Sequence, residues 1–309
     1  MTPADFLSSA GPLVTVIIPT RDRAELLPRA VASALGQTWK ALEILIVDDG
    51  SVDDTAGVLA GFDDPRIRVL RRDTPGGVSA ARNDAVRAAR GEFLALLDSD
   101  DEWLPKKTER QLAYMASTGH AVSQTQEIWM RGGKRVNPTH IHKKPDGWFF
   151  EASLGMCLVS PSTTIFRRGV IEAAGFFDES LPACEDYDLW LRIMLTRPIG
   201  LLDEYQVVRH GGRGDQLSTL YIGQDLFRIR AMVGLLGRPE TTAWHFACIE
   251  KELRRKTAIY AAGCLKRDRP EEAARVSAMV EAALDSARAG LAGAGGKATA
   301  DTQPATAVG

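Results

Sequence analysis

Short apolar runs alternate with segments of helical periodicity through the first part of this chain. Runs of apolar residues, many of them β-branched, predict buried strands at residues 13–18, 42–47 and 93–97 and a shorter strand at 67–70. Apolar residues three and four positions apart predict helices at 24–36, 78–90 and 105–117, and a short helix from Asp53. Because strands that alternate with helices are typical of α/β proteins, we expect a doubly wound, mostly parallel sheet.

The pattern becomes mixed after residue 118. A polar, strand-like segment at 122–136 contains Gly132-Gly133, which predicts a hairpin. Further strands are expected at 156–166 and 199–208, and helices at 168–174, 184–195, 220–236, 240–265 and 270–289. We therefore expect one α/β domain over 13–218, with halves at 13–118 and 119–218, and a C-terminal helical region over 219–290.

The two ends of the chain differ from the rest in composition. Residues 1–12 predict a loose leader. Residues 291–309 are mostly Gly, Ala and Thr with almost no large apolar side chain. Such a segment cannot bury enough surface to offset its conformational entropy, so we expect a disordered tail there.

Composition excludes several classes of protein. The formal net charge is −2, which gives no general basic field for nucleic acid. No apolar run is long enough for a transmembrane segment and the start does not resemble a signal peptide, although peripheral membrane contact stays open. The four cysteines are far apart and form no Cys-x-x-Cys pair, which favours free thiols and a cytoplasmic location.

Three of the predicted strands end in polar and acidic residues. The sequences after them are Pro19-Thr20-Arg21-Asp22-Arg23, Asp48-Asp49-Gly50-Ser51 and Asp98-Ser99-Asp100-Asp101. Parallel strands bring such ends to one edge of the sheet, where α/β proteins bind ligands. Since Mg²⁺ binds through one or two carboxylates plus substrate phosphates, Asp98-x-Asp100 is a candidate metal–diphosphate clamp. The alternative is a capped turn, which the same residues favour.

Asp49 and Arg82 are candidate contacts for a nucleotide. Asp49 could accept hydrogen bonds from the N–H of a base, or it could only form an Asx-turn into Gly50. Arg82 follows the Gly76-Gly77 pair in the first turns of a predicted helix, where it could meet a diphosphate with charge-assisted bonds. Its alternative role is a surface salt bridge.

Glu185-Asp186 and His210 complete the set of candidates. The two carboxylates open an amphipathic helix, where one of them could deprotonate a hydroxyl or both could only compensate the helix dipole. His210 lies between a predicted strand and a glycine-rich loop, so it is a candidate metal or phosphate contact, although a lone histidine is more often structural.

These motifs together resemble those of the family 2 glycosyltransferases. The similar segments are 14–21, 43–55, 77–83, 97–105 and 184–190, within a resemblance that covers roughly residues 13 to 212. The resemblance implies a GT-A fold, a nucleoside-diphosphate sugar donor, a divalent metal (Mg²⁺ or Mn²⁺) and inversion at the anomeric carbon. It makes 13–118 the nucleotide-binding half and 119–218 the acceptor half.

The resemblance also implies roles for single residues. Thr20 and Asp49 would line the base pocket, with Pro19, Arg21 and Ser99 as further substrate contacts. Arg82 would lie near the base or diphosphate, Asp98 near the ribose or metal, and Asp100 on the metal, with His210 as another candidate ligand. Asp186 would be the catalytic base, and Glu185 would be a substrate contact and its rival for that role. The Gln-x-x-Arg-Trp block of processive members is missing from this sequence, which favours a single transfer to a glycan, lipid-linked or small-molecule hydroxyl.

Two other functions remain open at this point. A nucleotidyltransferase also uses a doubly wound sheet with acidic strand ends, but it usually has a glycine-rich basic loop after the first strand, and 19–23 contains no glycine. A non-catalytic nucleotide-sugar-binding module would keep Asp49 and Asp98 without needing Asp186. The sequence names neither the base, the sugar nor the acceptor.

Overall fold

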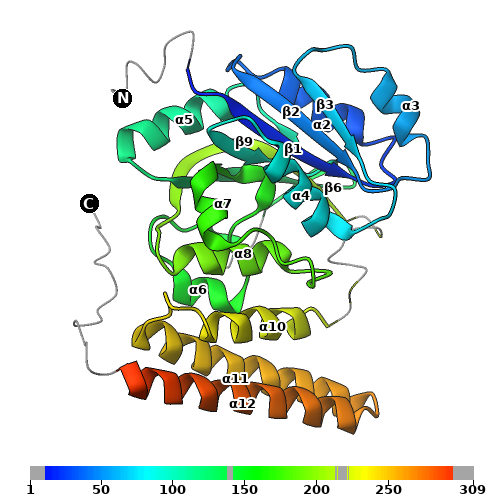
Figure 1. Ribbon diagram of the computed structural model, residues 1–309. Coiled ribbons are helices and arrows are strands. Elements are labelled where there is room, and N and C mark those ends of the chain that lie inside the picture. Colours follow the sequence, from blue (N-terminus) through cyan, green and yellow to red (C-terminus); the bar gives the residue numbers. More distant parts are fainter. Residues whose placement is uncertain (1–10, 138–141, 213, 215–220, 222, 295–309) are drawn as a thin grey trace.

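The computed structural model describes residues 11–137, 142–212, 214, 221 and 223–294 (Figure 1). The expected leader and tail therefore lie mostly outside the described residues, as does part of the glycine-rich loop after His210. None of the described helices is both long and apolar enough to cross a lipid bilayer.

A mixed sheet forms the centre of the upper part of the molecule (Figure 1). Its order is β3-β2-β1-β4-β8-β6-β9-β5, with β7 beside β6. The parallel half consists of β1 (Val14–Thr20), β2 (Leu42–Asp48), β3 (Ile67–Arg71) and β4 (Phe93–Leu96). The other strands are β5 (Glu102–Trp103), β6 (Val122–Arg131), β7 (Lys134–Val136), β8 (Ile165–Arg167) and β9 (Gly200–Gly211). The sheet becomes mixed where β8 pairs antiparallel with both β4 and β6, while β6 and β9 are parallel.

Helices cover both faces of the parallel half. They are α2 (Leu27–Leu35), α3 (Thr55–Ala60), α4 (Gly77–Ala88) and α5 (Lys107–Thr118). Successive strand residues belong to different cores: Val16 packs in the cluster that includes α2 and α5, whereas Ile17 packs in the cluster that includes α4. This division confirms the doubly wound α/β fold that the apolar runs predict.

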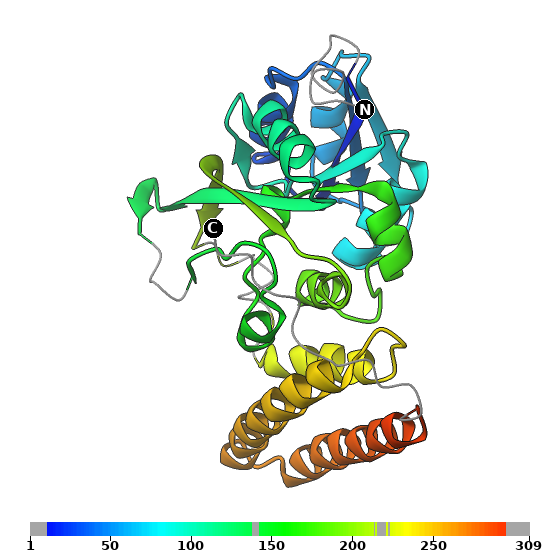
Figure 2. The same cartoon turned by 90° about the vertical axis from the view of Figure 1, so that its left-hand side faces the viewer.

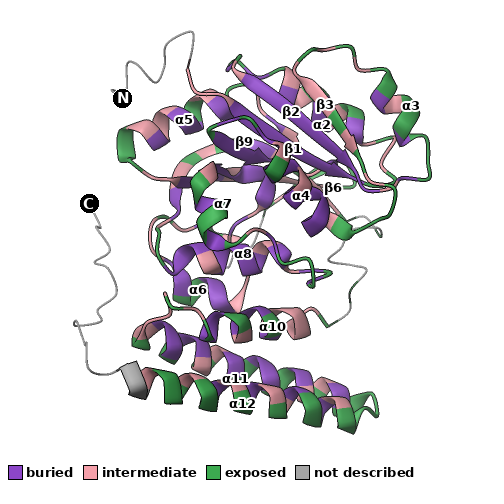
Figure 3. Ribbon diagram, in the orientation of Figure 1, coloured by how far each residue is buried: buried purple, intermediate pink, exposed green. Residues whose placement is uncertain are grey.

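The second half adds helices below the sheet, where most inward-facing residues are buried (Figure 3). They are α6 (Phe150–Gly155), α7 (Arg168–Ala174), α8 (Glu185–Met194), α10 (Asp225–Leu236), α11 (Ala243–Lys266) and α12 (Pro270–Ala294). The last three form a layer at the end of the molecule opposite β2 and β3 (Figures 1 and 2). Ile249, Leu253 and Leu284 of this layer join the same apolar cluster as Trp190 of α8.

Three predicted elements differ from the structure. The strand expected at 156–166 is wrong except at its end, because Pro161–Thr163 forms a 3₁₀ turn in which Thr163 Oγ1 donates to the carbonyl of Ser160 (2.7 Å). The helix expected from residue 220 begins at Asp225. The last helix continues to Ala294, so the first residues of the expected tail are helical, and Leu291 packs against the core.

Candidate active site

A cavity of about 1150 Å³ opens at the carboxyl edge of the parallel strands. The segments after β1, β2 and β4 line one side of it, together with the start of α4. The start of α8 lines the floor, and β6, β9 and the start of α10 line the remaining walls. The three polar strand ends therefore meet at one edge, as the sequence predicts, and the cavity is large enough for a substrate of nucleotide-sugar size.

The sequence leaves two roles open for Asp49, a turn-forming residue and a contact in the ligand site. In the structure Asp48 forms the turn and Asp49 lies in the site. Asp48 Oδ1 accepts from the N–H of Ser51 (2.9 Å), so Asp48 stabilises the turn. Asp49 Oδ1 and Oδ2 accept from the N–H groups of Gly76 and Gly77, each at 2.8 Å. Asp49 is thus buried in the cavity wall and fixes the loop that begins α4, where Gly77 has a positive φ of 85°.

The neighbouring strand-end residues also line the cavity. Pro19, Thr20 and Ser99 are buried, whereas Arg21 is exposed and lies 3.7 Å from Asp22. The hydroxyl oxygen of Thr20 is buried and has no hydrogen-bond partner among the described residues. A buried hydroxyl without a partner costs free energy, so it is a candidate contact for a polar ligand.

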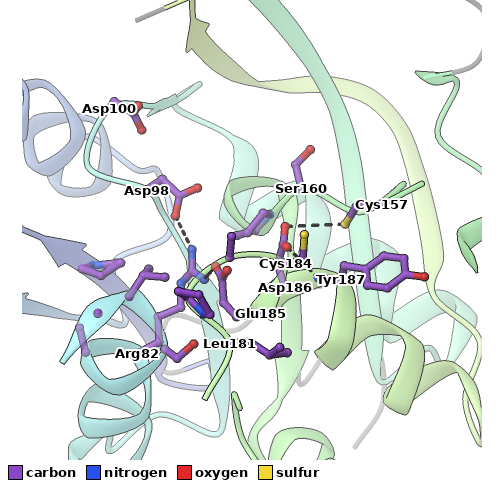
Figure 4. Close-up of a pocket in the computed structure, with 18 of the residues that line it drawn as sticks. Arg82, Asp98, Asp100, Cys157, Ser160, Leu181, Cys184, Glu185, Asp186 and Tyr187 are labelled. Carbon is purple, nitrogen blue, oxygen red and sulfur yellow. Dashed lines mark hydrogen bonds and ion pairs between the residues drawn. The ribbon is translucent and has the colours of Figure 1, made fainter. Parts of the chain in front are cut away.

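Arg82 lies at the centre of the site (Figure 4). Its Nη2 donates to Asp98 Oδ1 (2.8 Å) and its Nη1 donates to Glu185 Oε1 (2.7 Å), while the ring of Phe177 lies 5.1 Å from the guanidinium carbon. Burial alone would lower the pKa of Arg82, but the carboxylates of Asp98 and Glu185 raise it above its usual value. The buried cation therefore joins two carboxylates from separate halves of the chain, and it is not a surface salt bridge.

Glu185 and Asp186 have different surroundings although they are adjacent. Glu185 is buried at 5% exposure and its carboxylate is bound by Arg82. Asp186 is half-buried, and its Oδ2 accepts from the thiol of Cys157 (Sγ to Oδ2, 3.7 Å), which Figure 4 shows on the far side of Asp186 from Arg82. Asp188 points elsewhere and pairs with Arg192. Asp186 is therefore the acidic residue of this helix start that has no cation bound to it among the described residues.

The pKa values of both carboxyl groups are raised. Burial and the nearby charge of Asp186 raise the pKa of Glu185 to about 7, against the opposing effect of Arg82. Burial also raises the pKa of Asp186, while Arg82 opposes the shift. A raised pKa brings a carboxylate closer to the range in which it can both accept and release a proton near neutral pH.

Asp98, Asp100 and Asp101 follow β4 as the sequence predicts, but they do different things. Asp101 is buried, and it accepts from Ser162 Oγ (2.6 Å) and from the N–H of His210 (3.1 Å). Burial and the charges of Asp100 and Asp98 raise its pKa. All three line the cavity, and Asp98 is partly exposed. Asp101 is therefore structural, and the other two are the candidate ligands.

Asp98 and Asp100 fit a metal ion that takes its other ligands from a bound substrate and water. Within the described residues, no group of three His, Cys, Asp or Glu side chains converges as a metal site. Arg82 binds one oxygen of Asp98, Oδ1, and leaves Oδ2 available to a ligand. Two carboxylates at the edge of a cavity fit an ion such as Mg²⁺, which takes the rest of its ligands from phosphate and water.

His210 lies beside this cluster but does not line the cavity. Its Nε2 is 3.6 Å from Glu102 Oε1, and its backbone N–H binds Asp101. Burial, followed by the charge of Arg29, lowers the pKa of His210. These contacts give it a structural role, and its assignment as a metal ligand stays a prediction.

The sequence reasoning missed the cavity wall formed by β6 and β9. Glu127 is buried and accepts from Trp129 Nε1 (2.7 Å) and Ser160 Oγ (3.1 Å). Two cations lie near the same carboxylate, Lys144 at 3.8 Å and Arg209 at 3.7 Å. The alternation Glu127-Ile128-Trp129 gave a possible signal, since it puts an acid and an aromatic ring on one face of a strand.

Cys157 was also missed because its segment was predicted as a strand. Its Sγ lies 3.2 Å from the carbonyl oxygen of Val159 and 3.7 Å from Asp186 Oδ2. A thiol has one proton, so it donates to one of these acceptors at a time. All four cysteines are unpaired.

Known proteins are similar to this chain in both sequence and fold. The family model described as glycosyl transferase family 2 matches residues 15–174. An Escherichia coli protein named UDP-Glc:alpha-D-GlcNAc-diphosphoundecaprenol beta-1,3-glucosyltransferase WfaP is 31% identical over 210 residues, which cover 64% of this chain and 78% of that protein. Other relatives are longer, and the chain spans 29% and 61% of two of them.

Two solved structures share the fold at low sequence identity. Staphylococcus aureus TarS 1-349 in complex with UDP-GlcNAc has a TM-score of 0.69 and 20% identity, covering 90% of this chain and 88% of that one. Mannosyltransferase PcManGT from Pyrobaculum calidifontis, in complex with GDP-Man and Mn²⁺, has a TM-score of 0.53 and 17% identity, covering 91% and 87%. These likenesses agree with the GT-A fold expected from the sequence.

Proposed function

This chain belongs to glycosyl transferase family 2, and we propose that it is an inverting enzyme that makes a single transfer from a nucleoside-diphosphate sugar to an acceptor hydroxyl. Membership in the family makes it a glycosyltransferase and argues against both a nucleotidyltransferase and a non-catalytic binding module. The donor is supported by the nucleotide sugars in the complexes of TarS and PcManGT.

The difference between Glu185 and Asp186 carries the proposal. Arg82 binds the Glu185 carboxylate, so Asp186 is the acid that can take a proton from a hydroxyl in the cavity. The hydroxyl oxygen forms the new bond to the anomeric carbon as the bond to the diphosphate breaks, and its proton passes to Asp186. Direct displacement with one base inverts the configuration at the anomeric carbon. The transition state resembles an oxocarbenium ion, as it does in glycoside hydrolysis.

Asp98 and Asp100 are proposed to hold a divalent ion together with the donor diphosphate. When bound, Mg²⁺ or Mn²⁺ supplies Lewis-acid stabilisation of the charge on the leaving diphosphate. Arg82 orients Asp98 through its 2.8 Å bond. Thr20 and Asp49 are proposed to line the base pocket, where the Thr20 hydroxyl, which finds no partner in the described part of the chain, supports a polar contact.

A lipid-linked sugar is the proposed acceptor. The Escherichia coli relative is named for an acceptor that carries diphosphoundecaprenol, and it matches this chain over most of its length. The lack of a Gln-x-x-Arg-Trp block supports one transfer over repeated addition. The four unpaired cysteines support a cytoplasmic location.

The test compares Asp186→Asn with Glu185→Gln in the full chain. UDP and GDP sugars are first screened by thermal shift with Mg²⁺ or Mn²⁺, because a ligand at 100 times its Kd stabilises by about 2.7 kcal/mol. Transfer to an N-acetylglucosaminyl diphospholipid is then measured. Asp186→Asn should keep donor binding and lower the transfer rate by about 10²–10⁴-fold, whereas Glu185→Gln should lower it less. Parent-level transfer by Asp186→Asn would refute the base assignment.

A further inference from the structure

The β6–β7 hairpin extends beyond the body of the protein, at the left edge of Figure 2. The five residues of its tip, 131–135, contain three cations and two glycines and no acid. Gly132 and Gly133 both have positive φ, 55° and 75°, as the tight turn requires. The tip thus has a local charge of +3 on a chain whose net charge is −2.

None of the three cations of the tip has an acidic partner among the residues that the structure describes. Arg131, Lys134 and Arg135 are exposed, and none of them has a carboxylate within 4.0 Å among the described residues. Arg131 and Lys134 are direct cross-strand partners. Like charges opposite each other destabilise a hairpin, so this arrangement favours an external anionic partner.

An exposed aromatic ring accompanies these cations. Tyr205 of β9 is 53% exposed, and the guanidinium of Arg135 lies over its ring at 5.6 Å. Tyrosine prefers the boundary between water and lipid, where its ring is apolar and its hydroxyl stays hydrated. Arg131 and Lys134 lie on one face of the hairpin, whereas Arg135, opposite Met130, lies with Tyr205 on the other. We define these four residues, on the two faces of the tip, as the hairpin surface.

One face of the hairpin surface, the face of Arg131 and Lys134, continues into the wall of the active-site cavity. Trp129 lines the cavity and stands two residues before Arg131 on β6. Residues two apart on a strand share a face, so Arg131 follows Trp129 along the side of β6 that faces the cavity. An anionic surface bound by the hairpin would therefore lie next to the open side of the site.

We propose that the hairpin surface binds the anionic phospholipid surface of the membrane that carries the lipid-linked acceptor. This inference rests on the lipid-linked acceptor proposed above, because such an acceptor stays in the bilayer and the enzyme must come to it. No described helix crosses a bilayer, so in the described part of the chain the contact is peripheral. Three cations near an anionic leaflet raise binding on the order of 10²-fold, which gives weak, reversible and salt-sensitive attachment.

The test is co-sedimentation of the full chain with vesicles that contain no acceptor. Vesicles of phosphatidylcholine alone are compared with vesicles that also contain phosphatidylglycerol. The parent should bind only the anionic vesicles and dissociate as salt is raised. The Arg131→Glu/Lys134→Glu variant should bind at least ~10-fold more weakly, because each cation near the surface contributes a factor of about five.

A matched control variant distinguishes the effect of the position of the charges from the effect of the net charge of the protein. Arg197→Glu/Arg230→Glu makes the same change in net charge at two exposed arginines away from the hairpin, and it should bind the anionic vesicles like the parent. The proposal is overturned if the parent ignores anionic vesicles, if the hairpin variant binds like the parent, or if the control loses as much binding. Binding that appears only after a polyprenyl diphosphate is added would assign the surface to the acceptor headgroup and overturn the phospholipid assignment.

A nucleotide-binding measurement separates this proposal from the proposed function. Thermal shift by UDP with Mn²⁺ should be the same in the parent and both variants, which also checks their folding. Vesicle binding without any nucleotide binding would contradict the glycosyl-transfer proposal but leave the membrane surface supported. Nucleotide binding without vesicle binding would contradict the membrane surface but leave the glycosyl-transfer proposal supported.

Discussion

Glu185→Gln should be more stable than the parent protein at pH values at which Glu185 of the parent is deprotonated. Glu185 is 5% exposed, and burial together with the charge of Asp186 raises its pKa from an ordinary value of 4.5 to about 7. The folded state therefore holds this proton more tightly than the unfolded state does. The contribution of Glu185 to stability is fully present below pH 4.5 and is lost as the pH rises through about 7.

The size of the effect follows from the two pKa values. Between 4.5 and about 7, at about 1.4 kcal/mol per pH unit, the parent loses roughly 3 kcal/mol of stability through Glu185. Glutamine has nearly the shape of the protonated acid and can still accept a hydrogen bond from Arg82. The variant keeps the neutral state at every pH and should avoid this loss.

The measurement is urea unfolding of the parent and Glu185→Gln across this pH range. The difference in the free energy of unfolding should be near zero at acid pH and should grow to roughly 3 kcal/mol in favour of the variant above pH 7. Glu25→Gln, at an exposed carboxylate, is the control and should give a small difference at all pH values. A variant that is less stable than the parent above pH 7 would mean that the ion pair with Arg82 outweighs burial, and the reasoning would be wrong.

Two further predictions concern the same site. Asp100→Ala should bind UDP without the dependence on Mg²⁺ or Mn²⁺ that we expect of the parent, measured by thermal shift; unchanged metal dependence would exclude Asp100 from the clamp. Cys157→Val should move the acid limb of the pH–rate profile upward by less than ~1 unit, because the thiol shares its one proton between the Val159 carbonyl and Asp186 and favours the charged form of Asp186 only while it donates there. Cys157→Ser keeps a donor and should move the profile less. An unmoved profile in the valine variant would mean that the thiol only fills space.

The parallel half of the fold could be predicted because its signals are local. Runs such as 13–18 and 42–47 are buried on both faces, and the helix between them has a clear apolar side. The antiparallel half could not be predicted in the same way. β8 is three residues long, and its place between β4 and β6 depends on pairing with Phe93–Ala95 and Val122–Ser123, which no local pattern encodes.

In the candidate site, too, the features with a local sequence signal could be predicted and the long-range contacts could not. The strand-end acids could be located from sequence, since parallel strands must bring their ends to one edge. The partners of those acids could not, because Arg82 and Glu185 are 103 residues apart and Cys157 and Asp186 are 29 apart. Reading 156–166 as a strand hid Cys157, whose segment is irregular, and it also hid Ser160, which binds Glu127.

The contacts of Arg82 explain why two adjacent carboxylates need not share one role. A buried guanidinium has several donors but a single charge, and here it is used by Asp98 on one side and Glu185 on the other. Asp186 receives only part of that charge at a distance, together with a weak bond from a thiol. Among the described residues, no cation is therefore bound to the Asp186 carboxylate. A carboxylate without a bound cation can accept a proton, as a base must. The same pairing makes Glu185 a positioning residue, because it holds the cation that orients Asp98 at the edge of the cavity.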